Sequence, residues 1–219
     1  MANLTNILNS DSCAVADALD RLGLTGVAPR IHRLTTTNKL VGPVRTVVLA
    51  PASAGKTTNH HLATSSLESA RKGDVFVISN GARTDAAAWG GLLGRAGLRS
   101  GVAGVIIDGA CRDIDELNEL EFPVFARSAT PCSARGRFVE VARDVDTTIG
   151  DIPVRSDDWV VADGSGVVFI PQDRLDEVEA AVAEILLAER KIKKSIQQGR
   201  SLTNVFDQQY ETLTTANNA

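Results

Sequence analysis

The run GVAGVIIDG, at residues 101–109, is the sequence feature that most limits how this chain can fold. Its residues are almost all apolar, so it predicts a strand buried near the centre of a sheet. Two charged residues, Arg112 and Asp113, follow shortly after it. In open α/β sheets, ligands collect beyond the carboxyl ends of such strands. The run therefore predicts both a central strand and a site at its end.

The rest of the chain predicts an α/β fold. The segment at 41–50 is nearly continuous in apolar and β-branched residues, as in a strand that is covered on both faces. Helices alternate with strands early in the chain, whereas strands cluster later and a long helix follows them. This order favours a single-domain α/β/α sandwich that ends in a long helix. We expect further strands at 74–80, 123–128, 138–145 and 158–171, and helices at 12–22, 59–71, within 85–101, at 112–120 and at 173–197. Asp11 or Ser12 can cap the first of these helices, and Gly23 ends it.

Composition excludes several classes of protein. The chain has 219 residues, of which 43% are hydrophobic, which suffices for a sizeable core. Its net charge is −4 with acidic and basic residues interspersed, so no basic stripe favours nucleic acid as a partner. No signal-peptide pattern opens the chain, and no run of about 18 apolar residues predicts a membrane span. We expect a soluble, cytoplasmic protein that binds neither nucleic acid nor membranes.

Other patterns that invite a functional interpretation are weaker. The stretch ASAGKTT, at 52–58, ends like a phosphate-binding P-loop. However, Ala50 stands where that pattern requires glycine, and Pro51 has no N–H to offer a phosphate. We expect a tight turn with a surface Lys56 instead. Surface histidines and free thiols are also expected, because no metal-binding spacing connects His32, His60, His61, Cys13, Cys111 and Cys132.

The candidate site surrounds the pair Arg112 and Asp113. Gly91 precedes the pair by twenty intervening residues and Glu116 follows it after two, a G-x20-R-D-x2-E pattern. An arginine can bind a carboxylate through two parallel hydrogen bonds, and a single aspartate with waters suits Mg²⁺ or Mn²⁺. The loop Gly90-Gly91-Leu92-Leu93 could offer backbone N–H groups to the same anion if it starts a helix. On the residues alone, a surface ion pair of Arg112 with Asp113 or Glu116 is the alternative.

Seven longer patterns carry a family resemblance: SCAVADALDRLG, GPVRTV, ARKGDVFVISNGARTDAAAWGGLL, GVIIDGACRDIDEL, FPVFARSATP, DWVVADGSGVVFIP and E-x9-G-x-S-L from Glu189 to Leu202. They resemble the RraA-like family. They keep their order and spacing over about 10–206, which implies one RraA-like domain within 1–219 and the swivelling α/β/α sandwich of that family. The family includes class II pyruvate aldolases that act on 4-hydroxy-4-methyl-2-oxoglutarate and 4-carboxy-4-hydroxy-2-oxoadipate.

The resemblance implies roles for the site residues. Asp113 would contact a divalent metal, Mg²⁺ or Mn²⁺, and Arg112 would hold the pyruvyl part of the substrate. The backbone of Gly90, Gly91, Leu92 and Leu93 would complete the anion pocket. Some members carry an acidic side chain where Gly91 stands, which leaves the proton-handling group open between Glu116 and Glu189. The resemblance places a glutamate near Glu189 at the active site of the adjacent subunit, in a homotrimer or a hexamer.

The implied activity is retro-aldol cleavage of a 4-hydroxy-2-oxo acid to pyruvate, in which the metal and Arg112 stabilise the pyruvate enolate. Oxaloacetate decarboxylation passes through the same enolate and is expected as a side activity. No Schiff-base lysine is needed, and Lys56 and Lys72 are expected at the surface. Two alternatives remain. One is a lyase or hydratase for a related hydroxy acid. The other is a regulator that binds a ribonuclease without catalysis, although such members typically lack the aspartate after the arginine.

Overall fold

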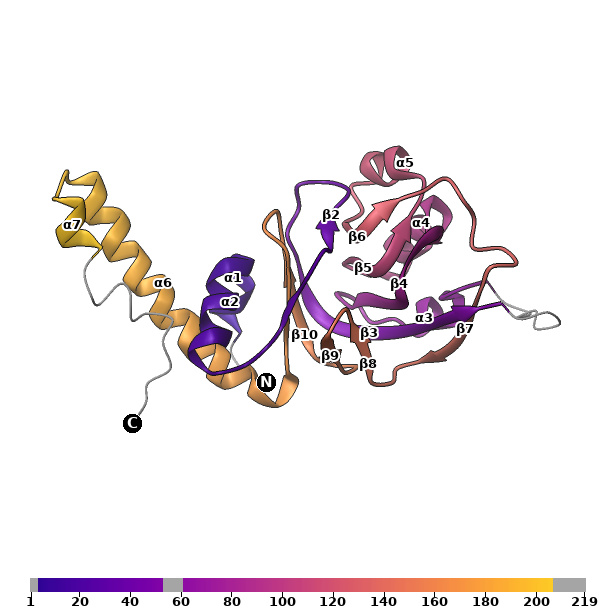
Figure 1. Cartoon of the computed structure of the whole chain (residues 1–219), viewed down its shortest axis with the longest axis horizontal. Coiled ribbons are helices and arrows are strands. Elements are labelled where there is room, and N and C mark those ends of the chain that lie inside the picture. Colours follow the sequence, from indigo (N-terminus) through magenta and orange to yellow (C-terminus); the bar gives the residue numbers. More distant parts are fainter. Residues whose placement is uncertain (1–3, 53–60, 207–219) are drawn as a thin grey trace.

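The computed structural model describes residues 4–52 and 61–206, so most of the ASAGKTT stretch, with Lys56 and His60, lies outside the described residues. It is a mixed α/β structure with a long C-terminal helix (Figure 1). The helices are α1 (Thr5–Asn9), α2 (Ser12–Arg21), α3 (Thr64–Glu68), α4 (Gly91–Ser100), α5 (Ile114–Glu119), η1 (Gln172–Arg174), α6 (Leu175–Gln197) and α7 (Leu202–Val205). The strands are β1 (Val27–Ala28), β2 (His32–Arg33), β3 (Leu40–Pro51), β4 (Val75–Trp89), β5 (Gly104–Cys111), β6 (Val124–Ala129), β7 (Phe138–Arg143), β8 (Thr147–Ile149), β9 (Ile152–Val154), β10 (Trp159–Ala162) and β11 (Val167–Ile170).

Parallel pairing builds the part of the sheet that carries the candidate site. Strands β3, β4, β5 and β6 are neighbours in that order, and each pair runs parallel. Every residue of β5 is buried, which confirms the central strand predicted from the apolar run. Because parallel strands end at the same edge, the segments that follow β4 and β5 lie next to each other there.

Side-chain alternation along the strands shows how the layers are arranged. In β5, Ile107 packs against the cluster that includes α3, α4 and α5, whereas Ile106 faces the opposite way. In β10, Val160 joins Ile106 in this inner cluster, and Val161 packs against α1, α2 and α6. The sheet therefore folds over itself with helices on both outer faces, as Figure 1 shows. This arrangement confirms the predicted α/β class and adds a second layer of strands.

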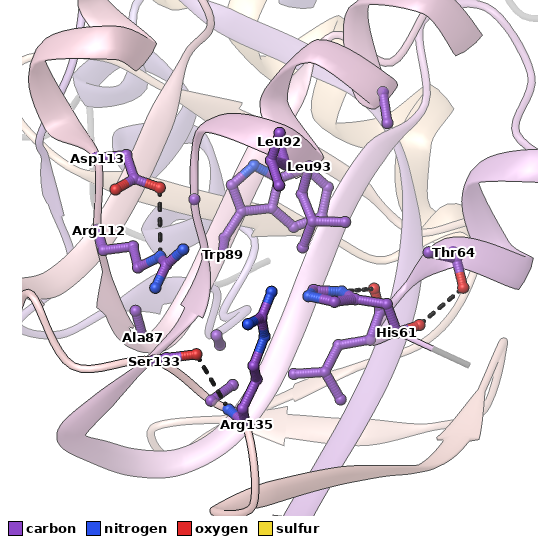
Figure 2. A pocket seen from close by; sticks show the side chains of 15 residues that line it. His61, Thr64, Ala87, Trp89, Leu92, Leu93, Arg112, Asp113, Ser133 and Arg135 are labelled. Atoms are coloured by element: carbon purple, nitrogen blue, oxygen red, sulfur yellow. Dashed lines mark hydrogen bonds and ion pairs between the residues drawn. The ribbon is translucent and has the colours of Figure 1, made fainter. Parts of the chain in front are cut away.

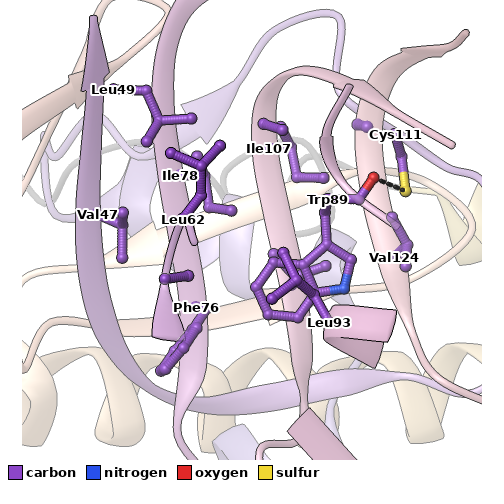
Figure 3. Packing of buried hydrophobic residues seen from close by; sticks show 14 of the residues in the cluster. Val47, Leu49, Leu62, Phe76, Ile78, Trp89, Leu93, Ile107, Cys111 and Val124 are labelled. Carbon is purple, nitrogen blue, oxygen red and sulfur yellow. Dashed lines mark hydrogen bonds between the residues drawn. The ribbon is translucent and has the colours of Figure 1, made fainter. Parts of the chain in front are cut away.

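Trp89 fixes the end of β4 in the core below the candidate site. Its ring stacks on Phe122, with centroids 6.0 Å apart, and meets Phe76 edge-on at 6.1 Å. Figure 3 shows Trp89 and Phe76 together with Leu93 from α4 and Cys111 from β5. Aromatic pairs at these separations each add about 1 kcal/mol beyond the burial of their area. The strand end that leads into the site is therefore held rigidly from below.

Local signals predicted the start and end of α2 correctly. Asp11 is its N-cap and accepts a hydrogen bond from the Ala14 N–H at 2.8 Å, as expected for a helix start. Gly23 follows the helix with φ of +65°, a conformation that glycine adopts at little cost. The long helix predicted at 173–197 is also confirmed, because η1 and α6 together cover 172–197.

Two local predictions were wrong in extent. The strand predicted at 74–80 continues to Trp89, so the residues at 85–89 are strand rather than loop. A bend at Gly81 and Ala82, both with φ of +58°, interrupts the regular alternation that would have identified the continuation. The helix predicted at 59–71 is short: within 61–71, only Thr64–Glu68 is helical.

The three cysteines are free thiols, as predicted. Cys111 is fully buried, and burial raises the pKa of its thiol to about 12. It is therefore a packing residue rather than a nucleophile. Across the described ranges, no helix is long and apolar enough to span a membrane.

Candidate active site at the ends of strands β4 and β5

Two neighbouring strand ends bring the predicted residues together. Trp89 and Cys111, the last residues of β4 and β5, lie in register. The Arg112 N–H donates a hydrogen bond to the Trp89 carbonyl at 3.1 Å. The twenty residues between Gly91 and Arg112 form most of α4 and all of β5, which return the chain to the same edge of the sheet. The two halves of the G-x20-R-D-x2-E pattern are therefore adjacent in space.

Asp113 directs its carboxylate toward α4 instead of capping its own helix. Its backbone is left-handed, with φ of 57° and ψ of 42°, and its side chain makes no capping hydrogen bond to α5. A left-handed residue costs about 1–2 kcal/mol, and aspartate tolerates this conformation better than most residues. The carboxylate Oδ2 accepts a hydrogen bond from the Gly91 N–H at 3.0 Å. The strained backbone thus aims this carboxylate at the start of the neighbouring helix.

Arg112 and Asp113 also form the ion pair that the sequence left open as an alternative. Arg112 Nε lies 3.2 Å from Asp113 Oδ2, and the two side chains are 34% and 36% exposed. Ion pairs this exposed contribute little to stability. The pair therefore does not by itself explain why these two charges stand at a buried strand end.

Side chains pack closely against two glycines beside the pair. A Cβ on Gly90 would lie 2.7 Å from Asp113 Oδ2, and a Cβ on Gly91 would overlap the Glu116 carboxylate. Glu116 Oε1 accepts a hydrogen bond from Arg95 Nε at 2.6 Å. Arg95 thus holds the Glu116 carboxylate across the backbone of Gly91, where any larger residue would displace it.

A pocket of about 250 Å³ opens beside Arg112 (Figure 2). This volume suits a ligand smaller than a typical drug molecule. Apolar residues from the end of β4 and from α4 form much of its wall: Ala87, Ala88, Trp89, Leu92, Leu93 and Ala96. The polar side chains that line it are His61, Thr64, Arg112, Asp113, Ser133 and Arg135. The predicted residues Gly90, Leu92, Leu93 and Arg112 therefore share one small cavity.

Sequence reasoning missed His61, Ser133 and Arg135 as pocket residues. His61 was expected at a polar surface, and the structure places its exposed ring at the pocket. Ser133 and Arg135 belong to the loop between β6 and β7, which no motif singled out. The concentration of arginines in SARGRF, at 133–138, was the one signal that could have drawn attention to this loop.

Glu189 lies elsewhere in the molecule. It is on α6 and accepts a hydrogen bond from Lys193 Nζ at 2.6 Å. Figure 1 shows α6 on the far side of β10 from α4 and α5. Within one chain Glu189 does not reach the pocket of Arg112, so a role for Glu189 there requires a second subunit.

Asp113 is the one acidic side chain among the described residues that line the pocket, and a carboxylate is a ligand that hard divalent cations accept. One Asp113 oxygen has no partner among the described residues, and Glu116 lies one turn further along. Within the described part of the chain, no three histidine, cysteine, aspartate or glutamate side chains gather into a metal-binding group. Mg²⁺ commonly takes one or two protein carboxylates and keeps several waters, whereas structural zinc needs four protein ligands. Asp113 therefore suits Mg²⁺ or Mn²⁺ better than zinc.

Comparison with known proteins identifies relatives of the chain. The family described as "RraA-like: Aldolase/RraA" matches residues 12–169. A protein from Halalkalibacterium halodurans, named "Putative 4-hydroxy-4-methyl-2-oxoglutarate aldolase", is 33% identical over 177 residues, which are 80% of this chain and 79% of that protein. Protein DlpA of Legionella pneumophila is 32% identical over 199 residues, or 91% of this chain. The chain spans about a third of DlpA, because the match covers 32% of that protein.

Among solved structures, the chain resembles RraAS2 of Streptomyces coelicolor. That protein is described as an unusual member of the RNase ES inhibitor RraA protein family. The two structures superpose with a TM-score of 0.77 at 25% sequence identity. The match covers 87% of this chain and 94% of RraAS2, so the likeness extends over nearly the whole fold.

Proposed function

Because this chain belongs to the RraA-like family, we propose that it is a divalent-metal-dependent carbon–carbon lyase. It releases pyruvate from a 4-hydroxy-2-oxo acid such as 4-hydroxy-4-methyl-2-oxoglutarate, and it decarboxylates oxaloacetate as a side activity. The observation that carries the proposal is the geometry of Asp113, whose strained backbone holds a partly free carboxylate beside Arg112 at the pocket. The relative named for this aldolase supports the choice of reaction.

The pocket offers donors for the pyruvyl end of such a substrate. Arg112 can hold the carboxylate through its guanidinium. The N–H groups of Leu92 and Leu93 lie in the first turn of α4, where a helix leaves them without partners, and no side chain caps them. Both residues line the pocket, so their backbone can bind the same anion.

Cleavage breaks the bond between C3 and C4 of the substrate. A base removes the proton of the C4 hydroxyl, the C4 oxygen becomes a carbonyl, and the bonding pair moves to the pyruvyl unit as an enolate. A proton then adds at C3 to give pyruvate. Asp113 would hold a divalent metal, which when bound would supply positive charge to the oxygen on which the enolate charge rests. Arg112 adds fixed positive charge there, and one such donor is typically worth about 3 kcal/mol.

Two glutamates are candidates for the base. Glu116 lies in the first turn of α5, where Arg95 orients it against Gly91, so it belongs to the same chain as Arg112 and Asp113. Glu189 can take part only if a homotrimer or hexamer places α6 of one subunit over the pocket of another. In that case the active site lies at a subunit interface.

A coupled assay for pyruvate tests the proposal. With Mg²⁺ or Mn²⁺, we expect pyruvate from oxaloacetate and from 4-hydroxy-4-methyl-2-oxoglutarate, and chelation should abolish its release. Asp113→Ala should lower the rate by about 10²–10³-fold. Asp157→Ala is the matched control, because Asp157 is also left-handed and exposed, and it lies away from the pocket. Equal background rates under all conditions would rule out the lyase.

A regulator that binds a ribonuclease without catalysis is the second candidate, and the likeness to RraAS2 favours it. Such a protein would release no pyruvate with or without metal. Inhibition of a ribonuclease would also be the same for the wild type and for Asp113→Ala. The Arg112 and Asp113 pair at the pocket is the reason for ranking the lyase first.

A further inference from the structure

Arg135 brings a second guanidinium to the pocket of Arg112. Figure 2 shows its side chain pointing into the cavity, between Arg112 and His61. Throughout residues 4–52 and 61–206, no acidic side chain pairs with Arg135. Nearby arginines differ, because Arg83 pairs with Asp85 and Arg137 donates to the Ser133 carbonyl at 2.9 Å. Arg135 therefore brings to the cavity a positive charge that no acidic side chain of the described residues neutralises through an ion pair.

Backbone contacts hold the loop that carries Arg135 in place. The Ala87 N–H donates to the Cys132 carbonyl at 2.9 Å, and Ala87 and Ser133 form a β-bridge. Ser133 Oγ in turn accepts a hydrogen bond from the Arg135 N–H at 3.2 Å. The loop is therefore tied to β4 close to Trp89, on which the pocket is built. A side chain on a tethered loop can recognise a ligand with less ordering cost than one on a free loop.

The charges that line the cavity call for a ligand with more than one anionic group. Two guanidiniums face one carboxylate, and that carboxylate is the proposed metal ligand. A divalent cation would add further positive charge. Leu62 and Ala96 also line the cavity, and such apolar side chains offer no partner to an anion.

We propose that Arg135 binds a distal carboxylate of the substrate, on the fragment that leaves when pyruvate is formed. This inference rests on the proposed lyase function and assigns the residue that recognises the carboxylate beyond the scissile bond, a group that 4-hydroxy-4-methyl-2-oxoglutarate carries. Arg112 then holds the pyruvyl carboxylate and Arg135 the distal one. The co-product released with pyruvate therefore carries a carboxylate itself, whereas a hydroxy-oxo acid that would release a neutral aldehyde is a poor substrate.

A matched pair of ligands isolates this contact without any turnover. 2-Oxoglutarate has the carbon chain of a 4-hydroxy-2-oxoglutarate but lacks the hydroxyl group, so it cannot undergo retro-aldol cleavage. 2-Oxopentanoate has the same chain length with a methyl group in place of the distal carboxylate. Titration calorimetry with Mg²⁺ present should show that the wild type binds 2-oxoglutarate about 10–100-fold more tightly than 2-oxopentanoate.

Substitution of Arg135 should remove this preference. We expect Arg135→Gln to weaken the binding of 2-oxoglutarate by about 10–100-fold and to leave the affinities for 2-oxopentanoate and pyruvate unchanged. Arg99→Gln is the matched control, because Arg99 is exposed at the last turn of α4 and the same charge is lost. A preference that survives in Arg135→Gln, or an equal loss for both ligands, would overturn the proposal.

The same variants distinguish this inference from the lyase proposal. If the wild type forms no pyruvate but Arg135→Gln still loses the preference for 2-oxoglutarate, the distal anion site is supported and the lyase function is ruled out. If pyruvate is formed and the preference is unchanged in Arg135→Gln, the lyase function is supported and the distal anion site is ruled out.

Discussion

The carboxylates of Glu179 and Asp113 differ in how many hydrogen bonds their oxygens accept. Glu179, on α6, is 9% exposed and accepts hydrogen bonds from the Asn6 N–H, the Asn6 side chain and the Ile7 N–H, all within 2.8 Å. Asp113 accepts one hydrogen bond, from Gly91, and is 36% exposed. The first carboxylate is fully used in holding α1 to α6. The second keeps an oxygen that can bind something else.

Asp108 and Asp163 follow the first pattern. Asp108 precedes Asp113 by five residues, yet it faces the opposite side of the sheet, where it pairs with Arg127 and accepts from the Gly150 N–H. Asp163 accepts from both the N–H and the hydroxyl of Ser12, each at 2.7 Å. The comparison teaches that the free acceptor beside a cavity, rather than the residue type, marks a candidate for function.

The largest expected effect on stability is at Glu179. Glu179→Ala should lower the free energy of unfolding by about 2–3 kcal/mol, because it leaves the buried first-turn N–H groups of α1 without acceptors. Urea denaturation measures this change. Glu184→Ala is the control, since Glu184 is 63% exposed and pairs with Arg21, and its loss should cost at most about 1 kcal/mol. Equal losses in the free energy of unfolding for the two variants would show that the hydrogen bonds accepted by Glu179 add no more stability than an exposed ion pair.

A smaller effect, on the rate of pyruvate release, is expected at Gly91, against which the Glu116 carboxylate lies. Gly91→Ala should push the Glu116 carboxylate aside and break its hydrogen bond to Arg95. If Glu116 is the base, pyruvate release should fall by about 10-fold or more, which corresponds to about 1.4 kcal/mol in the barrier. In a Glu116→Ala background, Gly91→Ala should then change the rate no further. Fully additive losses would show that Gly91 acts independently of Glu116.

The smallest effect should appear as a pH dependence at Asp163. Burial alone would raise the pKa of Asp163, but hydrogen bonds from Ser12 and Ser165 outweigh it and hold the pKa below its ordinary value. The stability that Asp163 contributes is therefore present above the unfolded pKa of about 4 and is lost as pH falls through the lower folded pKa.

Thermal denaturation of Asp163→Asn checks this expectation. At pH 7 the variant should be about 1 kcal/mol less stable than the wild type, and the difference should shrink once the pH is well below about 4. Asp151→Asn, at an exposed position in the turn between β8 and β9, should show no such difference. A difference for Asp163→Asn that is constant from pH 7 to pH 3 would show that its carboxylate charge is not what docks α2.

Strand β5 could be predicted from the sequence, whereas the second half of β4 could not. A strand buried on both faces needs a continuous apolar run, and GVIIDG supplies one directly. The segment DAAAW has little intrinsic strand preference, because alanine is depleted in strands. It is extended because Ala87 pairs with β5 on one side and with the loop at Ser133 on the other. Those partners lie far away in the sequence.

The sequence by itself determined the central strand, the cap of α2, and the placement of Arg112 and Asp113 just beyond a buried strand end, because burial and capping depend on neighbouring residues. Only the tertiary structure decided which charges share the pocket. Arg135 reaches it because the Cys132 carbonyl binds the Ala87 N–H, and Glu116 lies over Gly91 because α4 and α5 meet there. Such contacts join segments distant in the chain, so no local pattern records them.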